Sequence, residues 1–337
     1  MEKETLGKLT LAVSPYTHAD RRKATLQVID TFVPYLALWA VMAWMLHQGY
    51  PYWIILALSV PTAGLQVRIF ILFHDCCHGS FFASRRANRI LGYITGILTF
   101  TPFEQWRRAH AIHHESVGDL DRRGVGDIWL MTTEEFSAAS RRECAMYRLV
   151  RNPFVILVFG PLIVFLIEHR FFRKSDYRRE RISVVVTDIA IALLIVIAGL
   201  TIGFRAYALI QAPVMFIAGS IGLWLFYVQH QFEGVYWARH NIWDRLKAAL
   251  QGSSYYKLPK ALQWFTGNIG LHHIHHVQQR IPNYNLQQCF DDLPALQRIK
   301  PLTLLGSLRC MRLHLWDEEH EKLVSFRSRH SSLDTLS

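Results

Sequence analysis

The 337-residue chain has few cysteines, and they follow no recognisable pattern. The chain has five cysteines, of which only Cys76 and Cys77 are close in sequence, and no CxxC pair occurs. Neither a disulfide framework nor a cysteine-bound zinc site is therefore expected. The N-terminus lacks a short apolar stretch followed by small residues, so no cleaved signal peptide is predicted. We therefore expect reduced thiols that face the cytosol.

Acidic residues are also scarce. The chain has 26 Asp and Glu against 37 Lys and Arg, a formal net charge of +11. Its basic residues flank apolar segments and do not form a separate nucleic-acid-binding domain, so nucleic-acid binding is not expected. A basic face of this kind suits the anionic headgroups of membrane lipids, or an acidic protein partner.

Long apolar runs are abundant, and 51% of the residues are hydrophobic. Four runs are long enough to cross a hydrocarbon core about 30 Å thick as helices. They comprise residues 31–46, 52–73, 183–203 and 207–228. Gln48–Pro51 joins the first two runs, and a turn near Phe204–Ala206 is expected to join the last two. The sequence therefore predicts two transmembrane hairpins.

Two further apolar segments are not expected to cross the membrane. Segment 153–167 has basic residues on both flanks, Arg151 before it and Arg170 after it, and basic flanks favour the cytoplasmic side. Segment 90–103 separates two histidine motifs, which could not share a site if it crossed. Both segments are predicted to be interfacial or re-entrant. Segment 298–315 mixes apolar and basic residues and is predicted to be an amphipathic helix on the bilayer.

These patterns predict an all-α integral membrane protein. We expect four transmembrane helices in two hairpins, interfacial or re-entrant helices, and a cytosolic helical cap that holds a metal site. Both termini are expected in the cytosol. Residues 1–326 are predicted to form a single membrane-embedded domain, and residues 327–337 a polar, flexible tail.

Three short histidine motifs indicate the metal site. Helical residues three or four apart share a face, so HxxxH and HxxHH spacings present imidazoles side by side. Imidazole is the commonest protein ligand for several transition metals. Three motifs supply more ligands than one tetrahedral metal needs, which indicates two metal ions with open positions. The motif histidines are His74, His78, His110, His113, His114, His272, His273, His275 and His276.

The third motif contains four histidines and therefore two possible first ligands. The HxxHH spacing favours His272 over its neighbour His273. Metal-bound histidines usually donate their second ring N–H to a carboxylate or a carbonyl group. Candidates for these supporting contacts are Asp75, Glu115, Asp119, Asp121, Asp127 and Asn268, although the Asp-rich loop is equally compatible with turns and helix caps.

The motifs resemble those of the membrane-bound fatty acid desaturases, most closely the bacterial acyl-lipid type. The resemblance extends from the first hairpin to about Asp292. Its most specific parts are the run His74–Phe82, the run Thr101–Arg107 leading into the second motif, Gly118–Gly124, Gly267–His272, and Arg280–Leu286. It implies a four-span fold with a cytosolic cap, a di-iron centre of two iron ions, and O2-dependent insertion of a double bond into an acyl chain.

The resemblance has further consequences for ligands, partners and location. It implies an extra iron ligand at the cytosolic end of the last span, where His230 lies, and favours His272 over His273. The expected partners are a fatty acyl or acyl-lipid substrate, O2, membrane lipids and a separate electron donor such as an acidic ferredoxin. The expected location is a bacterial inner membrane. Phe103 and Trp106 either line the acyl tunnel or belong to an interfacial aromatic belt.

Two other functions share part of the pattern. A lipid or carotenoid hydroxylase or ketolase would use the same di-iron site but would leave oxygen on its substrate. A non-enzymatic membrane metal or haem carrier is disfavoured, because the apolar segments contain no histidine at their centres. The runs Gly118–Gly124 and Arg280–Leu286 favour the desaturase.

Overall fold

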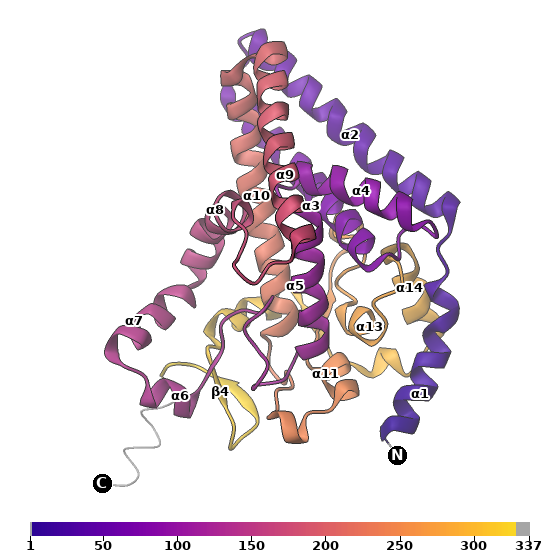
Figure 1. The fold of residues 1–337 in the computed structure, drawn as a ribbon, viewed down its shortest axis with the longest axis vertical. Coiled ribbons are helices and arrows are strands. Elements are labelled where there is room, and N and C mark those ends of the chain that lie inside the picture. The colour runs from indigo at the N-terminus through magenta and orange to yellow at the C-terminus, as the bar shows by residue number, and fades with distance from the viewer. Residues whose placement is uncertain (1, 328–337) are drawn as a thin grey trace.

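The computed structural model describes residues 2–327, and the fold is almost entirely helical. Most of the proposed tail, residues 328–337, lies outside the described residues. The longest helices are α2 (Arg21–His47), α3 (Tyr52–His78), α9 (Arg178–Ala198) and α10 (Phe204–His230). They rise as a tapering bundle above a broader cap that contains the two described chain ends (Figure 1).

Shorter elements form the cap and the sides of the bundle. The other α-helices are α1 (Glu2–Val13), α4 (Arg85–Leu98), α5 (Phe103–Ser116), α6 (Thr133–Ala138), α7 (Arg141–Val150), α8 (Gly160–Leu166), α11 (Arg245–Gln251), α12 (Lys260–Phe265), α13 (His272–Val277), α14 (Asn283–Asp292) and α15 (Leu304–Ser307). The 3-10 and π segments are η1 (Ser14–Thr17), η2 (Val155–Phe159), η3 (Glu168–Arg170), η4 (Gly199–Gly203), η5 (His240–Ile242), η6 (Leu296–Arg298) and η7 (Leu308–Arg312).

Five short strands interrupt the cap, which the sequence predicted to be wholly helical. They are β1 (Met131–Thr132), β2 (Tyr255–Lys257), β3 (Pro301–Thr303), β4 (Leu315–Asp317) and β5 (Lys322–Val324). Strand β4 pairs in parallel with β1 and antiparallel with β5, while β2 pairs in parallel with β3. The prediction of one amphipathic helix over 298–315 is therefore wrong, and only short elements, chiefly α15 and η7, are helical there. Pro301 cannot continue a helix interior, and the backbone around it pairs with β2 instead.

Local sequence signals explain where the two hairpins begin and turn. Asp20 caps α2 by accepting a hydrogen bond from the backbone N–H of Lys23 at 3.0 Å. Gly79 ends α3 with a left-handed φ of 65°, which glycine adopts without a steric penalty. The second hairpin turns at η4, where Gly203 has a φ of 89°, slightly before the predicted turn near Phe204.

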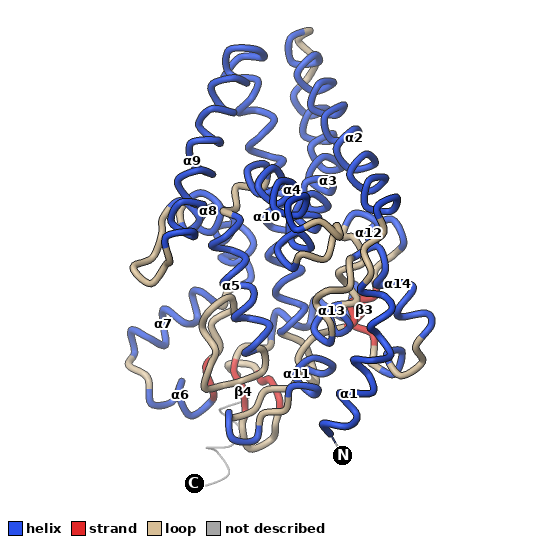
Figure 2. Tube along the Cα trace, turned by 45° about the vertical axis from the view of Figure 1, so that its right-hand side comes forward, coloured by secondary structure: helices blue, strands red, loops and turns tan. Residues whose placement is uncertain are grey.

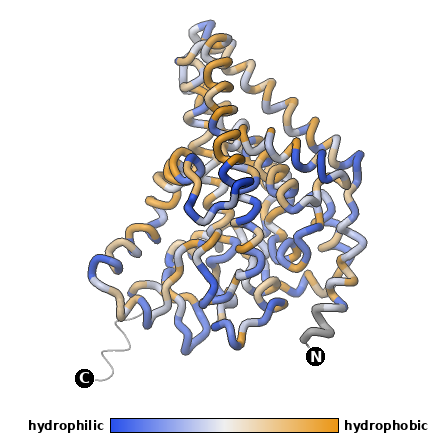
Figure 3. The backbone as a smooth tube through the Cα atoms, viewed as in Figure 1, coloured by the Kyte–Doolittle hydropathy of each residue, from blue (hydrophilic) through white to orange (hydrophobic). Residues whose placement is uncertain are grey.

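The long helices are apolar enough to cross a membrane. By length and composition α2, α3 and the continuous helical stretch Arg178–His230 qualify. That stretch contains 53 residues, so a straight course would be more than twice as long as the membrane core is thick, at about 1.5 Å per residue. It folds back at η4, and α9 and α10 stand as one column beside the column of α2 and α3 (Figure 2). The upper helices are the most hydrophobic part of the molecule (Figure 3).

The two weaker apolar segments are short helices in the structure. Helix α4 has 14 residues and packs against α3 and α9. The segment from Val155 to Arg170 is bent by 65° relative to α7 and packs against α10 through η2 and α8. Together with α7 it forms either a broken span or a re-entrant loop. Its large exposed side chains, including Phe159 at 47% and Ile167 at 53%, suit a lipid environment.

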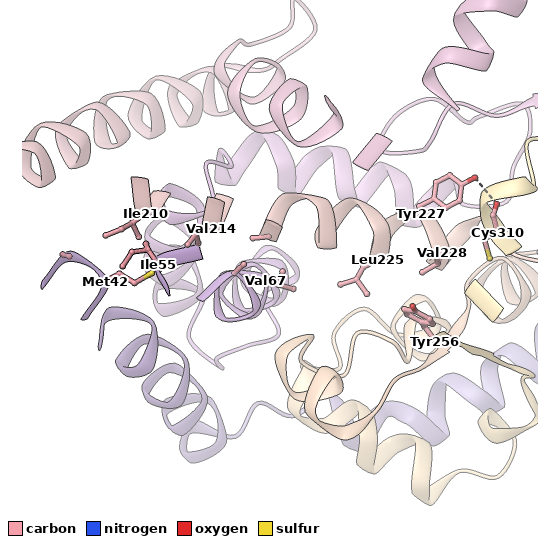
Figure 4. Packing of buried hydrophobic residues seen from close by; sticks show 13 residues of the cluster. Met42, Ile55, Val67, Ile210, Val214, Leu225, Tyr227, Val228, Tyr256 and Cys310 are labelled. Atoms are coloured by element: carbon pink, nitrogen blue, oxygen red, sulfur yellow. Dashed lines mark hydrogen bonds between the residues drawn. The ribbon is translucent and has the colours of Figure 1, made fainter. Parts of the chain in front are cut away.

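A buried apolar cluster joins the bundle to the cap. Met42, Ile55 and Ile210 pack together between α2, α3 and α10 at one end of the cluster (Figure 4). At its other end Tyr227 of α10 donates a hydrogen bond to the carbonyl oxygen of Cys310, at 3.2 Å (Figure 4). The cluster therefore fixes the lower end of α10, which carries His230, against the cap.

Candidate metal centre

Four helices bring nine histidines together below the bundle. Helices α3 and α10 end in histidines at the same level of the molecule, while α5 and α13 approach from the cap. These nine histidines are His74 and His78 on α3, His110, His113 and His114 on α5, His230 on α10, and His272, His275 and His276 on α13. They are the nine residues that the motifs and the family resemblance predicted.

The nine side chains form two separate groups. The first group contains five histidines, His74, His78, His110, His114 and His275, and the second contains four, His113, His230, His272 and His276. Within each group the ligand atoms lie within 4.8 Å of one another. Helices α5 and α13 each contribute to both groups, so His113 and His114 face different sites although they are adjacent in sequence.

The Nε2 atoms of neighbouring histidines lie at ligand spacing. In the four-histidine group the Nε2 of His230 lies 3.1 Å from that of His113 and 3.0 Å from that of His272. In the five-histidine group the Nε2 of His114 lies 3.1 Å from that of His110 and 3.0 Å from that of His275. Two nitrogens bound at about 2.0–2.1 Å to one metal are about 2.8–3.4 Å apart at octahedral or tetrahedral angles. Each group therefore has the dimensions of a metal site.

Hydrogen bonds to the Nδ1 atoms of His113 and His230 indicate that the Nε2 atoms of these rings are available to bind a metal. The Nδ1 of His113 lies 2.7 Å from a carboxylate oxygen of Asp127, and the Nδ1 of His230 lies 2.9 Å from the carbonyl oxygen of Gly252. These acceptors favour the tautomer with the ring proton on Nδ1, which leaves the Nε2 lone pair of a neutral ring available to a metal. In that tautomer the two Nε2 lone pairs face each other at 3.1 Å and repel unless a cation binds between them.

The five-histidine group also contains ring nitrogens that are available to bind a metal. The Nε2 atoms of His74 and His78 are buried and have no hydrogen-bond partner among the described residues. A buried polar atom without a partner costs roughly 1–3 kcal/mol, which metal coordination would remove. Burial and neighbouring imidazoles hold the pKa of His110, His114 and His275 well below the usual histidine range. These rings are therefore neutral, which is the form that binds metals.

A chain of polar contacts behind His74 orients this histidine at the end of α3. The Nδ1 of His74 lies 3.1 Å from a carboxylate oxygen of Asp75. The other carboxylate oxygen of Asp75 accepts hydrogen bonds from the backbone N–H and the side-chain amide of Asn283, at 2.6 and 2.8 Å. Asn283 in turn accepts a hydrogen bond from Gln27 of α2. Asp75 thus supports His74 as predicted, and Asn283 is a supporting residue that the sequence reasoning missed.

A tight loop positions Asp127 beneath His113. Gly126 has a φ of 72°, and a Cβ atom there would lie 3.0 Å from both the carbonyl oxygen of Ala109 and the Cβ of His113. Only glycine fits this position without strain, so the loop can pass close to α5. The side chain of Asp127 is 5% exposed, which protects its contact with His113 from water.

We expect Asp127→Asn to lose about 10–100-fold in activity or metal affinity, the usual cost of removing such a supporting carboxylate. Asparagine keeps the shape but lacks the charge that holds the proton on Nδ1 of His113. Metal content and product formation should be measured beside Asp317→Asn, which alters an aspartate–histidine contact that involves none of the nine histidines. Unchanged metal content and turnover in Asp127→Asn would contradict the orienting role.

Other predicted supporting residues lie elsewhere. Asp119 is buried and contacts the ring of His240 at 2.7 Å, while Asp121 pairs with Arg239. Neither carboxylate contacts a candidate ligand, because these long-range partners hold the Asp-rich loop against the segment after α10. Asn268 has a left-handed φ of 60° and donates a hydrogen bond to the carbonyl oxygen of Asn283, so it supports the site indirectly.

His273 points away from both groups. Its Nε2 lies 3.2 Å from the carbonyl oxygen of Leu296, and its ring contacts Tyr255. The structure therefore places His272 in the four-histidine group and His273 in the packing of the cap, which is the arrangement that the HxxHH spacing favoured.

The two aromatic candidates have different surroundings. The Trp106 ring stacks on the ring of His110, with a centroid distance of 4.3 Å and an interplanar angle of 24°. Phe103 is buried against Phe73 and Gly92, where a Cβ on Gly92 would lie 2.2 Å from the Phe103 ring. Trp106 therefore borders the five-histidine group, whereas Phe103 packs one turn farther away. A role for either residue in an acyl tunnel stays a prediction.

The geometry describes a membrane protein with a pair of adjacent all-histidine metal sites at the ends of its long helices. Comparison with known proteins identifies the group to which it belongs. The model of the family described as fatty acid desaturase matches residues 51–299. The chain belongs to the fatty acid desaturase family, and it is an oxidoreductase of that type.

Individual relatives support this assignment. The chain is 45% identical over 321 residues to a fatty acid desaturase of Bacillus subtilis, covering 95% of this chain and 91% of the relative. It is 26% identical over 266 residues to an sn-1 oleoyl-lipid 12-desaturase of Synechocystis, covering 74% and 73% respectively. It is also 26% identical over 252 residues to an sn-1 acyl-lipid omega-3 desaturase (ferredoxin) of Synechocystis, covering 69% and 64%.

Proposed function

We propose that this protein is an acyl-lipid desaturase that uses O2 and two iron ions to introduce a double bond into the acyl chain of a membrane lipid. The observation that supports this proposal best is the pair of buried groups of five and four histidines at the ends of membrane-length helices. The Synechocystis relatives are named as lipid desaturases, which favours an acyl chain on a lipid over a free fatty acid.

The proposed roles of the residues follow from the two groups. His74, His78, His110, His114 and His275 would hold one iron, and His113, His230, His272 and His276 the other. Bound iron would supply the redox chemistry with O2 that side chains lack, because an unactivated C–H bond offers no handle for acid–base or nucleophilic catalysis. In the balanced reaction, a –CH2–CH2– unit, O2, two electrons and two protons give –CH=CH– and two water molecules.

The chain's own residues would make this reaction selective. Asp75, Asp127 and the carbonyl of Gly252 fix the ring orientations, so the ligand set is organised before the substrate arrives. The ring of Trp106 packs beside His74 and His110, the ring of Phe73 packs against Trp106, and both would help to exclude water from the reacting methylene groups. The two electrons would come from a separate donor, and the ferredoxin in the name of one relative favours an acidic carrier protein.

Mass spectrometry of lipids tests the reaction. A host that expresses the chain and takes up deuterium-labelled saturated fatty acid should accumulate labelled lipids that lack two hydrogen atoms. A His275→Ala variant should not. Labelled lipids that instead gain an oxygen atom would favour the hydroxylase alternative, and unchanged lipids in a host with a competent ferredoxin would contradict both functions.

The proposed orientation places four crossings in a bacterial inner membrane, with the histidines and both termini in the cytosol. In a cysteine-free background, Ser14→Cys and Arg178→Cys should react with an impermeant maleimide only from the cytosolic side. Gln48→Cys and Arg205→Cys, at the opposite ends of the hairpins, should react only from outside. Labelling of Arg178→Cys from outside would mean that the bent segment at 153–167 crosses, and would contradict four crossings.

A further inference from the structure

A basic cleft lies beneath the bend between α7 and α8, apart from the nine histidines. It has a volume of about 690 Å³ and is lined by Arg148, Arg151, Asn152, Pro153, His314, Phe326 and Arg327. We propose that this cleft binds the phosphate of an anionic phospholipid headgroup. The proposal goes beyond the desaturase function and does not depend on the metal centre.

The first support is positive charge without acidic partners. Among the described residues the cleft is lined by three arginines and by no aspartate or glutamate. Within residues 2–327, neither Arg148 nor Arg151 forms an ion pair with a carboxylate, unlike Arg68, Arg123 and Arg170. Arginine binds phosphate oxygens through several N–H donors at once, so an uncompensated arginine group favours a phosphate.

Arg151 provides the strongest observation. Its side chain is fully buried, and its guanidinium donates to the side chain of Gln231 and the carbonyl oxygen of Leu313, each at 2.9 Å. Both partners are neutral, so the charge itself stays uncompensated, although a buried charge without a counter-ion is costly. An anion in the adjoining cleft would provide that counter-ion.

Two buried nitrogens at the cleft also lack partners. The Nε of Arg151 and the Nδ1 of His314 are buried and form no hydrogen bond among the described residues. The ring of His314 is held by stacking on Phe326, with a centroid distance of 4.3 Å. The guanidinium of Arg148 lies over the rings of Phe136 and Phe326, at 5.6 and 5.5 Å from their centroids. The cleft is thus built from oriented side chains.

The surroundings identify the source of the phosphate. Pro153 and Asn152 of the cleft immediately precede the apolar segment that contains η2 and α8. Large apolar side chains beside the cleft are exposed, with Leu149 at 54% and Phe154 at 63%. Figure 3 shows this hydrophobic segment continuing from α7 toward the bundle. A phosphate in the cleft would therefore lie where a lipid headgroup lies when its acyl chains cover α8.

Lipid binding by the purified full-length protein tests the proposal without any activity measurement. Native mass spectrometry would compare retention of dioleoyl phosphatidylglycerol and dioleoyl phosphatidylcholine, with inorganic phosphate as a separate competitor. We expect preferential retention of phosphatidylglycerol. Arg148→Gln should weaken that binding about fivefold, and Arg148→Gln with Arg327→Gln about 25-fold, which corresponds to ~1 kcal/mol for each basic residue at a membrane surface.

A matched control lies on the same helix. Arg142→Gln removes an exposed arginine of α7 that does not line the cleft, and it should leave binding unchanged. Arg151 is kept in all variants because it also holds Gln231 and Leu313. Equal retention of the two lipids, or unchanged binding in the double variant, would overturn the proposal. Displacement of the lipid by inorganic phosphate of similar affinity would show a free-phosphate site and overturn the lipid assignment. None of these results would affect the proposed desaturation.

Discussion

Replacement of His230 by alanine should abolish product formation and reduce the iron content of the protein, while membrane insertion is preserved. His230 is only 5% exposed, and its Nε2 lies 3.1 Å from the Nε2 of His113 and 3.0 Å from that of His272. It is the single contribution of α10 to the four-histidine group. Losing even an indirect contact to a metal typically costs about 10–100-fold, so loss of a ligand should cost at least that much.

The choice of control for His230→Ala matters. His240 is exposed, but its ring contacts the buried carboxylate of Asp119 at 2.7 Å, so His240→Ala would disturb the cap. His47 is exposed at the end of α2, next to the start of α3, whereas His74 and His78 lie at the other end of α3. His47→Ala should therefore keep normal iron and turnover. Near-normal turnover and full iron in His230→Ala would remove this residue from the ligand set and leave the other eight histidines as the site.

Active protein should contain two iron ions per chain, and removal of the metal should abolish activity. The groups of five and four histidines have the spacing of two sites, and an all-imidazole donor set suits iron as well as zinc, copper or nickel. Metal analysis by mass spectrometry should approach two iron equivalents. After treatment with a chelator, ferrous iron should restore turnover, whereas zinc should not, because zinc has no redox chemistry.

Two outcomes would contradict the di-iron prediction. One is full activity with a single tightly bound zinc ion. The other is retention of one iron equivalent in active protein after His230→Ala. The measurement should be made on wild type, His230→Ala and His47→Ala in parallel, so that loss of metal during purification affects all three proteins equally.

The sequence predicted the long helices and most of the candidate ligands because these depend on local spacing, whereas His230 was expected only from the family resemblance. Apolar runs of membrane length became α2, α3, α9 and α10, and the HxxxH and HxxHH spacings placed imidazoles on one helix face. The hairpin turn was predicted near Phe204 but lies at η4, since the left-handed glycine at position 203 decides it.

Other features depend on contacts between distant segments and could not be predicted locally. Asp119 and Asp121 were expected near the metals, but they contact His240 and Arg239, more than a hundred residues away in sequence. The segment around Pro301 was expected to be helical, but it pairs with β2. The division of the histidines into five and four also depends on how α5 and α13 pack, which spacing alone does not determine.

That division has a consequence for assembly. His113 and His114 are neighbours on α5 but serve different groups, and the His114 ring stacks on that of His276, which belongs to the other group, with centroids 4.2 Å apart. An ion in one site would therefore hold in place both helices that complete the second site. Any entropic cost of holding α5 and α13 would be met with the first ion and not repeated for the second. Metal loading should accordingly be cooperative, with protein carrying one ion populated far less than protein carrying none or two.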